Sequence, residues 1–218
     1  MLTFDIVTLF PQLFESHLKE LPFKKAIEKE LVKINLHNLR DYANDKRGTV
    51  DDKPYGGGVG MILMIEPLYK VLKNIYGNST EKIELSAKQK IIVLAPNGVT
   101  FKQKTAQNLT ECEQITIICG RYEGIDGRIN EICDTTSISI GDFVLSGGEI
   151  PALAVMESTI RLIPSVLEKP EAALLESFST DTLEHPQYTR PEDFMGYKVP
   201  QTLLSGDHKK IEQWKREN

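Results

Sequence analysis

Cysteine and histidine are scarce in this chain of 218 residues, which holds three cysteines and four histidines. Cys112, Cys119 and Cys133 form no C-x-x-C pair, and the histidines are scattered along the sequence, so a zinc site is not expected. An odd number of thiols fits a reducing compartment. The three cysteines are therefore predicted to be small, buried, apolar side chains.

Long apolar runs and an excess of positive charge are missing as well. No stretch approaches the length of a membrane span, and the N-terminal MLTFDIVTLFP is short for a signal peptide and lacks its basic flank. We therefore expect a cytoplasmic protein with no membrane partner. The net charge of −5 argues weakly against a nucleic-acid partner, although a local basic patch would be enough to bind phosphates.

The common nucleotide-binding fingerprints are also absent. No G-x-G-x-x-G opens a helix after the first predicted strand, and G-x-x-x-x-G-K-[ST] does not occur, which disfavours NAD and ATP. The sequence contains no G-x-S-x-G nucleophile motif of a hydrolase. An adenosine-bearing ligand without phosphates is compatible with these absences.

Apolar segments and helical patterns alternate along the chain, which indicates an α/β fold. Strands are predicted at residues 3–9, 31–39, 91–96, 115–120 and 135–139. Helices are predicted within residues 12–30, where Pro22 breaks the pattern, and at residues 66–76, 101–109, 149–163 and 208–216. Because several strands are apolar without alternation, we expect a mostly parallel sheet with helices on both faces, followed by a small, mainly helical C-terminal part.

Three glycine-bearing loops are the candidate ligand site. CGRYEGIDGR (119–128) and IGDFVLSGGE (140–149) directly follow predicted strands, and PYGGGVGM occupies residues 54–61. Glycine lets the backbone approach a ligand closely, and ligands of open α/β sheets bind at the carboxyl ends of the strands. Any one of these loops is explained more simply as a tight turn, but the three together favour a ligand site.

Four segments resemble, in order, the bacterial tRNA (guanine-N1)-methyltransferases. They are VDDKPYGGGVGM, CGRYEGIDGR, SIGDFVLSGGE and YTRPEDFMGYKVPQTLLSGDH, and FDIVTLFP and STIRLIPSVL also match. This family belongs to the SPOUT class of methyltransferases, which use S-adenosylmethionine (AdoMet). The resemblance implies methylation of N1 of guanosine 37 in the tRNA anticodon stem-loop. It also implies a trefoil-knotted α/β domain and an obligate homodimer whose active sites are built from both subunits.

The resemblance divides the chain into three parts. Residues 1–164 are expected to form the AdoMet-binding catalytic domain, residues 165–181 an interdomain linker, and residues 182–218 the tRNA-binding domain. Relatives continue past this point with a further arginine-rich helix. The C-terminal domain is therefore expected to be a short version, natural or trimmed, that binds tRNA more weakly.

The resemblance also implies an AdoMet pocket made of three strand-end loops. Leu94, Ile140 and Leu145 can enclose an adenine, and backbone groups on glycine loops can recognise its edge. Glu123 is expected to orient the cofactor or to help hold Mg²⁺, which the family needs. The full expected set is Leu94, Pro96, Gly98, Gly120, Tyr122, Glu123, Gly124, Ile140, Gly141, Asp142, Phe143, Val144, Leu145, Gly147, Gly148 and Pro151.

Two further residues are expected to perform the chemistry. N1 of guanine carries a proton at neutral pH, so the reaction needs a general base, and the charge that develops on O6 needs a cationic donor. Glu176, in a Glu-Ser-Phe motif where relatives have Asp-Ser-Phe, is the expected base, and Arg161 is the expected donor. Without the resemblance, Glu176 would be interpreted as a solvated linker carboxylate. Arg161 would be interpreted with about equal weight as a cation at a helix C-terminus.

The polar stretch 40–58 and the C-terminal part are expected to contact tRNA through phosphates and stacked bases. The predicted tRNA-binding residues are Lys46, Arg47, Asp51, Lys53, Tyr55, His185 and Arg190. Three alternatives stay open. One is another SPOUT enzyme that modifies a different RNA position. Another is a catalytically impaired tRNA- or AdoMet-binding protein, suggested by the change from Asp to Glu and by the short tail. The third is a nucleotide-binding α/β enzyme of unknown reaction.

Overall fold

A computed structural model of the chain describes residues 1–77, 81–168, 177–178 and 184–217. The chain forms two compact units, residues 1–168 and residues 169–218, and each unit is described by itself. The boundaries predicted for the catalytic domain, the linker and the tRNA-binding domain stay a prediction. None of the described helices is both long and apolar enough to cross a lipid bilayer.

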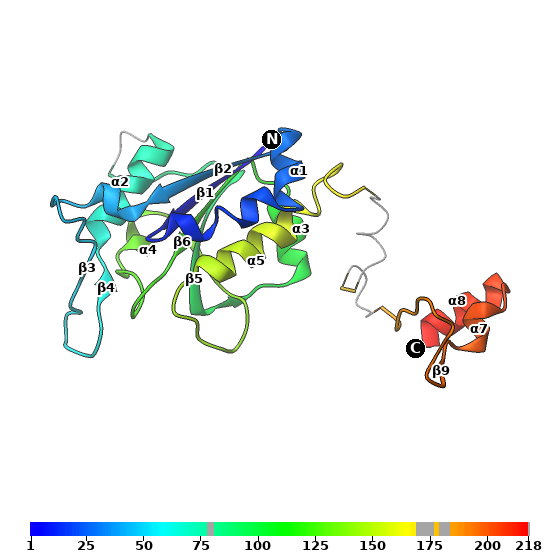
Figure 1. Cartoon of the computed structure of the whole chain (residues 1–218). Helices are drawn as coiled ribbons and strands as arrows, with labels where there is room; N and C mark the ends of the chain where they lie inside the picture. Colours follow the sequence, from blue (N-terminus) through cyan, green and yellow to red (C-terminus); the bar gives the residue numbers. More distant parts are fainter. Residues whose placement is uncertain (78–80, 169–176, 179–183, 218) are drawn as a thin grey trace. The chain divides into compact units, whose positions relative to one another are not determined.

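The first unit is built on a five-stranded sheet with the order β2-β1-β6-β5-β7 (Figure 1). All of its strand pairs are parallel. Its strands are β1 (Leu2–Thr8), β2 (Val32–Asn38), β5 (Gln89–Thr100), β6 (Gln114–Cys119) and β7 (Thr135–Ser139). The prediction of a parallel α/β sheet is therefore confirmed, whereas the trefoil knot stays a prediction.

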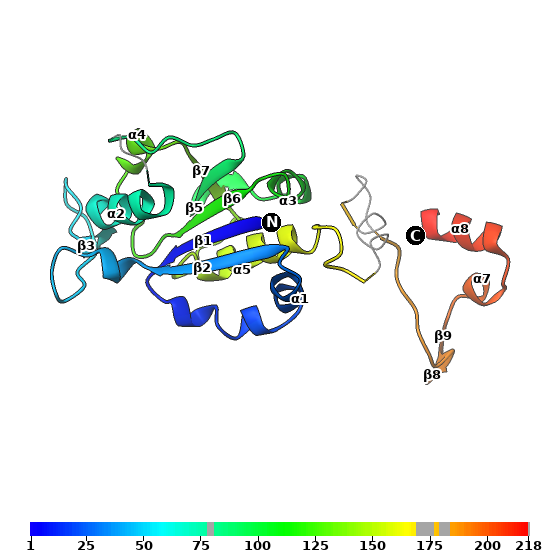
Figure 2. The same ribbon diagram turned by 90° about the horizontal axis from the view of Figure 1, so that it is seen from above.

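Successive side chains of a strand point to opposite faces of the sheet, and each face is packed in a hydrophobic core of its own. On β1, Phe4 and Ile6 belong to one core and Val7 to the other, and on β6, Ile117 and Ile118 divide in the same way. Figure 2 shows α1 and α5 on one side of the sheet and α2 and α4 on the other. The helices are α1 (Phe23–Glu28), α2 (Ile65–Tyr76), α3 (Gln103–Leu109), α4 (Ile129–Ile132) and α5 (Glu149–Ile160). Such burial on both faces explains why these strands are apolar without alternation.

The remaining segments of the first unit depart from the sequence prediction in detail. Residues 12–30 form two 3₁₀ turns, η1 (Pro11–Leu13) and η2 (His17–Lys19), before α1. The stretch 40–58, predicted to be a loop, contains most of the 3₁₀ turn η3 (Leu39–Tyr42) and the strand β3 (Asp51–Asp52). β3 pairs with β4 (Ile62–Leu63) in a short antiparallel hairpin. Two-residue strands carry too little periodicity to be recognised in a polar sequence.

The second unit contains a hairpin and two helices. Its elements are β8 (Asp193–Phe194), β9 (Tyr197–Lys198), α7 (Gln201–Leu204) and α8 (His208–Glu217). The helix at 208–216 was predicted, whereas the hairpin and α7 fall in a proline-containing stretch that was predicted to be irregular. The hairpin turn has positive φ at both Met195 (55°) and Gly196 (91°), which matches the right-handed twist of its strands. Its two helices hold more of the described residues than its hairpin does, and a mainly helical C-terminal domain stays a prediction.

Candidate functional site

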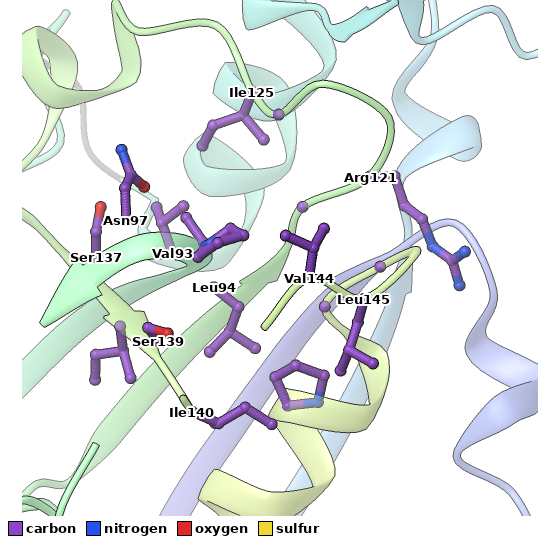
Figure 3. Close-up of a pocket in the computed structure, with 18 of the residues that line it drawn as sticks. Val93, Leu94, Asn97, Arg121, Ile125, Ser137, Ser139, Ile140, Val144 and Leu145 are labelled. Atoms are coloured by element: carbon purple, nitrogen blue, oxygen red, sulfur yellow. The ribbon is translucent and has the colours of Figure 1, made fainter. Parts of the chain in front are cut away.

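The carboxyl ends of β5, β6 and β7 surround a cavity of about 570 Å³ (Figure 3). Its walls come from residues 93–97, residues 120–130 and residues 137–151. Two of the three glycine loops identified in the sequence therefore meet at one cavity. The reason is topological, because parallel strands that are neighbours in a sheet end at the same edge.

Almost all of the predicted AdoMet-binding residues line this cavity. Gly98 and Asp142 are the two that do not, and the other members of the set do. The cavity residues are Leu94, Pro96, Gly120, Tyr122, Glu123, Gly124, Ile140, Gly141, Phe143, Val144, Leu145, Gly147, Gly148 and Pro151. Their role in binding AdoMet stays a prediction, since what is established is that they share one space.

Apolar side chains dominate one side of the cavity, and polar and apolar side chains are mixed on the other. Figure 3 shows the side chains of Leu94, Ile140 and Leu145 gathered on one side and those of Asn97 and Ser137 on the other. Leu94 is 5% exposed and Leu145 is 38% exposed, so the apolar side runs from the buried sheet to the rim. Such a division suits a ligand with a flat apolar ring at one end and polar groups at the other.

Sequence reasoning missed several wall residues, among them Asn97, Arg121 and Ser137. Arg121 stands inside the CGRYEG motif, so its position was a signal for the loop although no role was assigned to it. Asn97 and Ser137 carry no recognisable motif. Asn97 lies in the irregular part of β5 between Leu94 and Val99, and Ser137 lies in β7, the strand that pairs with β5 on both sides of that irregularity.

Glycines allow the backbones of the two cavity loops to approach each other closely where they cross. A Cβ added to Gly148 would lie 2.8 Å from Cys119 Cα, and one added to Gly147 would lie 2.1 Å from Arg121 Nε. The Gly148 N–H donates to Gly120 O at 2.9 Å. Gly98 has a different purpose, because its added Cβ would lie 2.5 Å from the Ile138 backbone nitrogen. Gly98 is thus required by the packing of β5 on β7 rather than by the cavity.

The third glycine loop, residues 54–61, and the strand β4 are hydrogen-bonded to the cavity loop that follows β6. The Glu123 N–H donates to Met61 O and the Leu63 N–H donates to Gly124 O, both at 3.0 Å. The loop between β3 and β4 carries Tyr55 at 100% exposure and Val59 at 91% exposure. The hairpin therefore rests on the cavity wall at its base and presents its tip to solvent.

The predicted tRNA-binding residues are mostly exposed. Lys46, Arg47 and Lys53 are exposed, and Asp51 is half-buried in β3. In the second unit, Arg190 is exposed and the His185 ring packs edge-on against Trp214 at 5.8 Å between ring centroids. These positions are open to a large partner, and their contact with tRNA stays a prediction.

Of the two predicted catalytic residues, Arg161 does not line the cavity of its own chain. Glu176 lies outside the described residues. Arg161 is the C-cap of α5, and it is half-buried. Since Pro151 at the start of α5 lines the cavity, Arg161 is about 15 Å further along the helix axis.

Metal ligands and reactive thiols are not concentrated at this site. Within the described part of the chain, no group of three or more His, Cys, Asp or Glu side chains is placed to hold a metal ion. All three cysteines are buried, as predicted. Burial, and next to it the charge of Glu149, raise the pKa of the Cys119 thiol well above its ordinary value. Cys119 is therefore a neutral packing residue beneath the cavity.

Comparison with known proteins extends the similarity over nearly the whole chain. The family described as tRNA (Guanine-1)-methyltransferase TrmD matches residues 2–218. The tRNA (guanine-N(1)-)-methyltransferase of Clostridioides difficile is 46% identical over 214 residues, which cover 98% of this chain and 90% of the relative. The enzyme of the same name from Bacillus pumilus is 48% identical over 212 residues, covering 97% and 84%. The one from Bacillus subtilis is 47% identical over 211 residues, covering 97% and 84%.

Proposed function

Because this chain belongs to the tRNA (guanine-1)-methyltransferase family, we propose that it transfers a methyl group from AdoMet to N1 of guanosine 37 in tRNA, beside the anticodon. The observation that carries the proposal is the cavity at the ends of β5, β6 and β7, which is walled by the motifs that the family resemblance names. The proposed activity would take place in the cytoplasm.

The cavity residues fit an adenosine-bearing cofactor. Leu94, Ile140 and Leu145 would enclose the adenine, and the backbone of residues 140–145 would recognise its edge. Asn97 and Ser137 offer amide and hydroxyl groups to the polar end of the ligand. When bound, AdoMet supplies a methyl carbon activated by a sulfonium. The task of the protein is then to orient the guanine and to remove its proton.

Proton removal and charge stabilisation are assigned to Glu176 and Arg161. Glu176 would accept the proton of guanine N1, and Arg161 would donate to O6 as negative charge develops there. Arg161 is one helix length from the cavity of its own chain, so it would serve the cavity of a second subunit. This separation supports a homodimer in which each active site takes its cofactor loops from one chain and Arg161 from the other.

Binding of tRNA is assigned to the β3–β4 hairpin and to the second unit. Lys46, Arg47 and Lys53 would meet phosphates, and the fully exposed Tyr55 would stack on a base. In the second unit, His185 and Arg190 would bind the anticodon stem of the tRNA. Residues 1–164 would then be the catalytic domain, residues 165–181 the linker and residues 182–218 the tRNA-binding domain. The target guanine would leave its stack to reach the methyl group.

Magnesium fits less well than AdoMet. Among the described residues Glu123 is an exposed carboxylate of the cavity wall, and no cluster of metal ligands accompanies it. Mg²⁺ in proteins is often bound through one or two carboxylates together with waters and phosphates of the substrate. We therefore derive no step through Mg²⁺.

The test is methylation of an unmodified tRNA transcript with labelled AdoMet, compared with a transcript in which guanosine 37 is replaced by adenosine. We expect methyl incorporation at N1 of guanosine 37 in the first transcript and none in the second. Equal incorporation in both would favour a SPOUT enzyme with another target. Binding of AdoMet without turnover would favour the catalytically impaired protein.

A further inference from the structure

An ion pair joins the two loops that form the cavity walls, and its carboxylate is buried whereas its Arg121 side chain is 20% exposed. Arg121 Nη2 lies 2.8 Å from Glu149 Oε2, and the Glu149 side chain is 2% exposed. Thr8 Oγ1 donates to the other carboxylate oxygen of Glu149 at 2.8 Å. The end of β1, the 120–130 loop and the first residue of α5 therefore meet at one carboxylate. Neither Arg121 nor Glu149 was among the site residues predicted from the sequence.

The guanidinium of Arg121 makes two further contacts, whereas its buried Nε has no hydrogen-bond partner among the described residues. It lies over the Phe10 ring at 4.5 Å from the ring centroid, and Nη1 donates to Ser146 O at 3.2 Å. It also covers Gly147, where a Cβ would collide with it. In Figure 3 the Arg121 side chain points away from Leu94 and Ile140, which lie inside the cavity. Arg121 is therefore placed to hold the wall rather than to touch a ligand.

Little else connects the two loops at this point. The described backbone contacts between them here are the Gly148 N–H bond to Gly120 O and the bridge between Arg121 and Gly147. A buried ion pair adds little net stability compared with apolar packing, but it restricts the geometry that its two partners can adopt. The positive end of the helix dipole also stabilises a carboxylate in the first turn of a helix, and this interaction helps to keep the Glu149 side chain in place.

We propose that Arg121 and Glu149 are positioning residues that set the spacing between the cavity walls, and so determine AdoMet affinity and the rate of methyl transfer. This inference rests on the proposed function, because it takes AdoMet as the ligand of the cavity. The pair acts through Gly120, Gly147 and Gly148, whose backbone lines the cavity. Without the ion pair, the two loops could move apart where they cross, and the cofactor site would become wider.

The experiment compares the wild-type chain with the double variant Arg121→Met, Glu149→Gln, which removes both charges and keeps the side-chain volume. Arg121→Lys is the conservative variant, because it retains the ion pair and loses the planar contacts with Phe10 and Ser146. The matched control is Lys88→Met, Glu113→Gln, which removes an exposed ion pair of 2.7 Å at the opposite, amino-terminal edge of the sheet. AdoMet binding is measured by calorimetry, and kcat and the KM for tRNA by methylation of tRNA.

For the double variant we expect AdoMet Kd to rise about tenfold and kcat to fall about 100-fold, with KM for tRNA changed by no more than about twofold. Arg121→Lys should lie between the double variant and wild type, and the control should match wild type in all three quantities. A double variant that loses thermal stability but binds AdoMet and turns over like wild type would overturn the inference. If the wild-type chain itself bound no AdoMet, the proposed function would fail first.

Discussion

The side chain of Glu123 occupies the space in which a side chain at Gly60 would stand. A Cβ added to Gly60 would lie 2.6 Å from Glu123 Cγ and from Oε1, and Gly60 has φ of +92°. The backbone at the same place is joined by the bond from the Glu123 N–H to Met61 O. The hairpin assigned to RNA and the loop that lines the cavity are thus in direct contact.

This contact predicts different outcomes for two glycine substitutions in the hairpin. Gly60→Ala should displace the flexible Glu123 carboxylate and lower the kcat for tRNA methylation about tenfold, as expected for a misplaced active-site group. Gly56→Ala is the control, because φ is +85° and nothing lies within 4 Å of its added Cβ. Both variants should lose about 1 kcal/mol of unfolding free energy from backbone strain. Equal activity of the two variants in a methylation assay would contradict this role of the contact.

Replacement of the proposed base should abolish turnover and spare cofactor binding. Glu176→Gln should lower kcat by roughly 10²- to 10⁴-fold, because an amide cannot accept the proton of guanine N1. Glu176→Asp, which restores the motif usual in the family, should retain activity. Glu168→Gln is the control, since that side chain is 92% exposed and 3.9 Å from Lys25. A near-normal methylation rate for Glu176→Gln would remove Glu176 from the mechanism.

The position of Arg161 predicts complementation between two inactive chains. Arg161→Met removes the proposed O6 donor, and Leu145→Arg places a charge in the cavity. Each variant alone should be inactive. A refolded equimolar mixture should regain about one quarter of wild-type activity, because half of the dimers are mixed and each has one intact site. A mixture as inactive as its components would show that Arg161 does not act across a subunit interface.

The contact between Asp5 and His37 predicts how stability depends on pH. Asp5 is 3% exposed and lies 2.8 Å from His37 Nε2. It accepts further bonds from Gln114 at 2.8 Å and from Asn35 at 2.9 Å. Burial raises the pKa of Asp5, but these bonds outweigh burial and hold the pKa below 3.8. The ionised carboxylate therefore stabilises the fold above that pH, and its contribution is lost as the pH falls through the lowered pKa.

Asp5→Asn should cost about 2 kcal/mol of unfolding free energy at neutral pH, because a buried network loses its charged acceptor. Urea denaturation from pH 7 to pH 3 should give a constant difference from wild type down to about pH 4.5, and a shrinking difference below it. The exposed Asp142→Asn should stay within about 0.5 kcal/mol of wild type throughout. A difference in unfolding free energy between Asp5→Asn and wild type that grew as the pH fell would contradict a lowered pKa of Asp5.

Most helices and strands of this protein, and the loops that form its cavity, can be predicted from local patterns in the amino-acid sequence. Strands such as residues 115–120 and helices such as residues 66–76 were predicted close to their observed bounds, because hydrophobic periodicity is local and survives in a single sequence. Glycines 120, 147 and 148 marked the cavity for the same local reason, since each stands next to the end of a strand or the start of a helix.

The contacts between those loops depend on the three-dimensional fold and could not be predicted from the sequence. Thr8 and Glu149 are 141 positions apart and share a hydrogen bond. Arg121 forms an ion pair with Glu149 from a different loop, and no repeat or motif spacing in the sequence predicts that contact. The same holds for Asn97 and Ser137 at one cavity, for Gly60 in contact with Glu123, and for Arg161 at the far end of the helix that starts at the cavity. Contacts of this kind arise from the order in which strands join the sheet, and strand order leaves no period in the sequence.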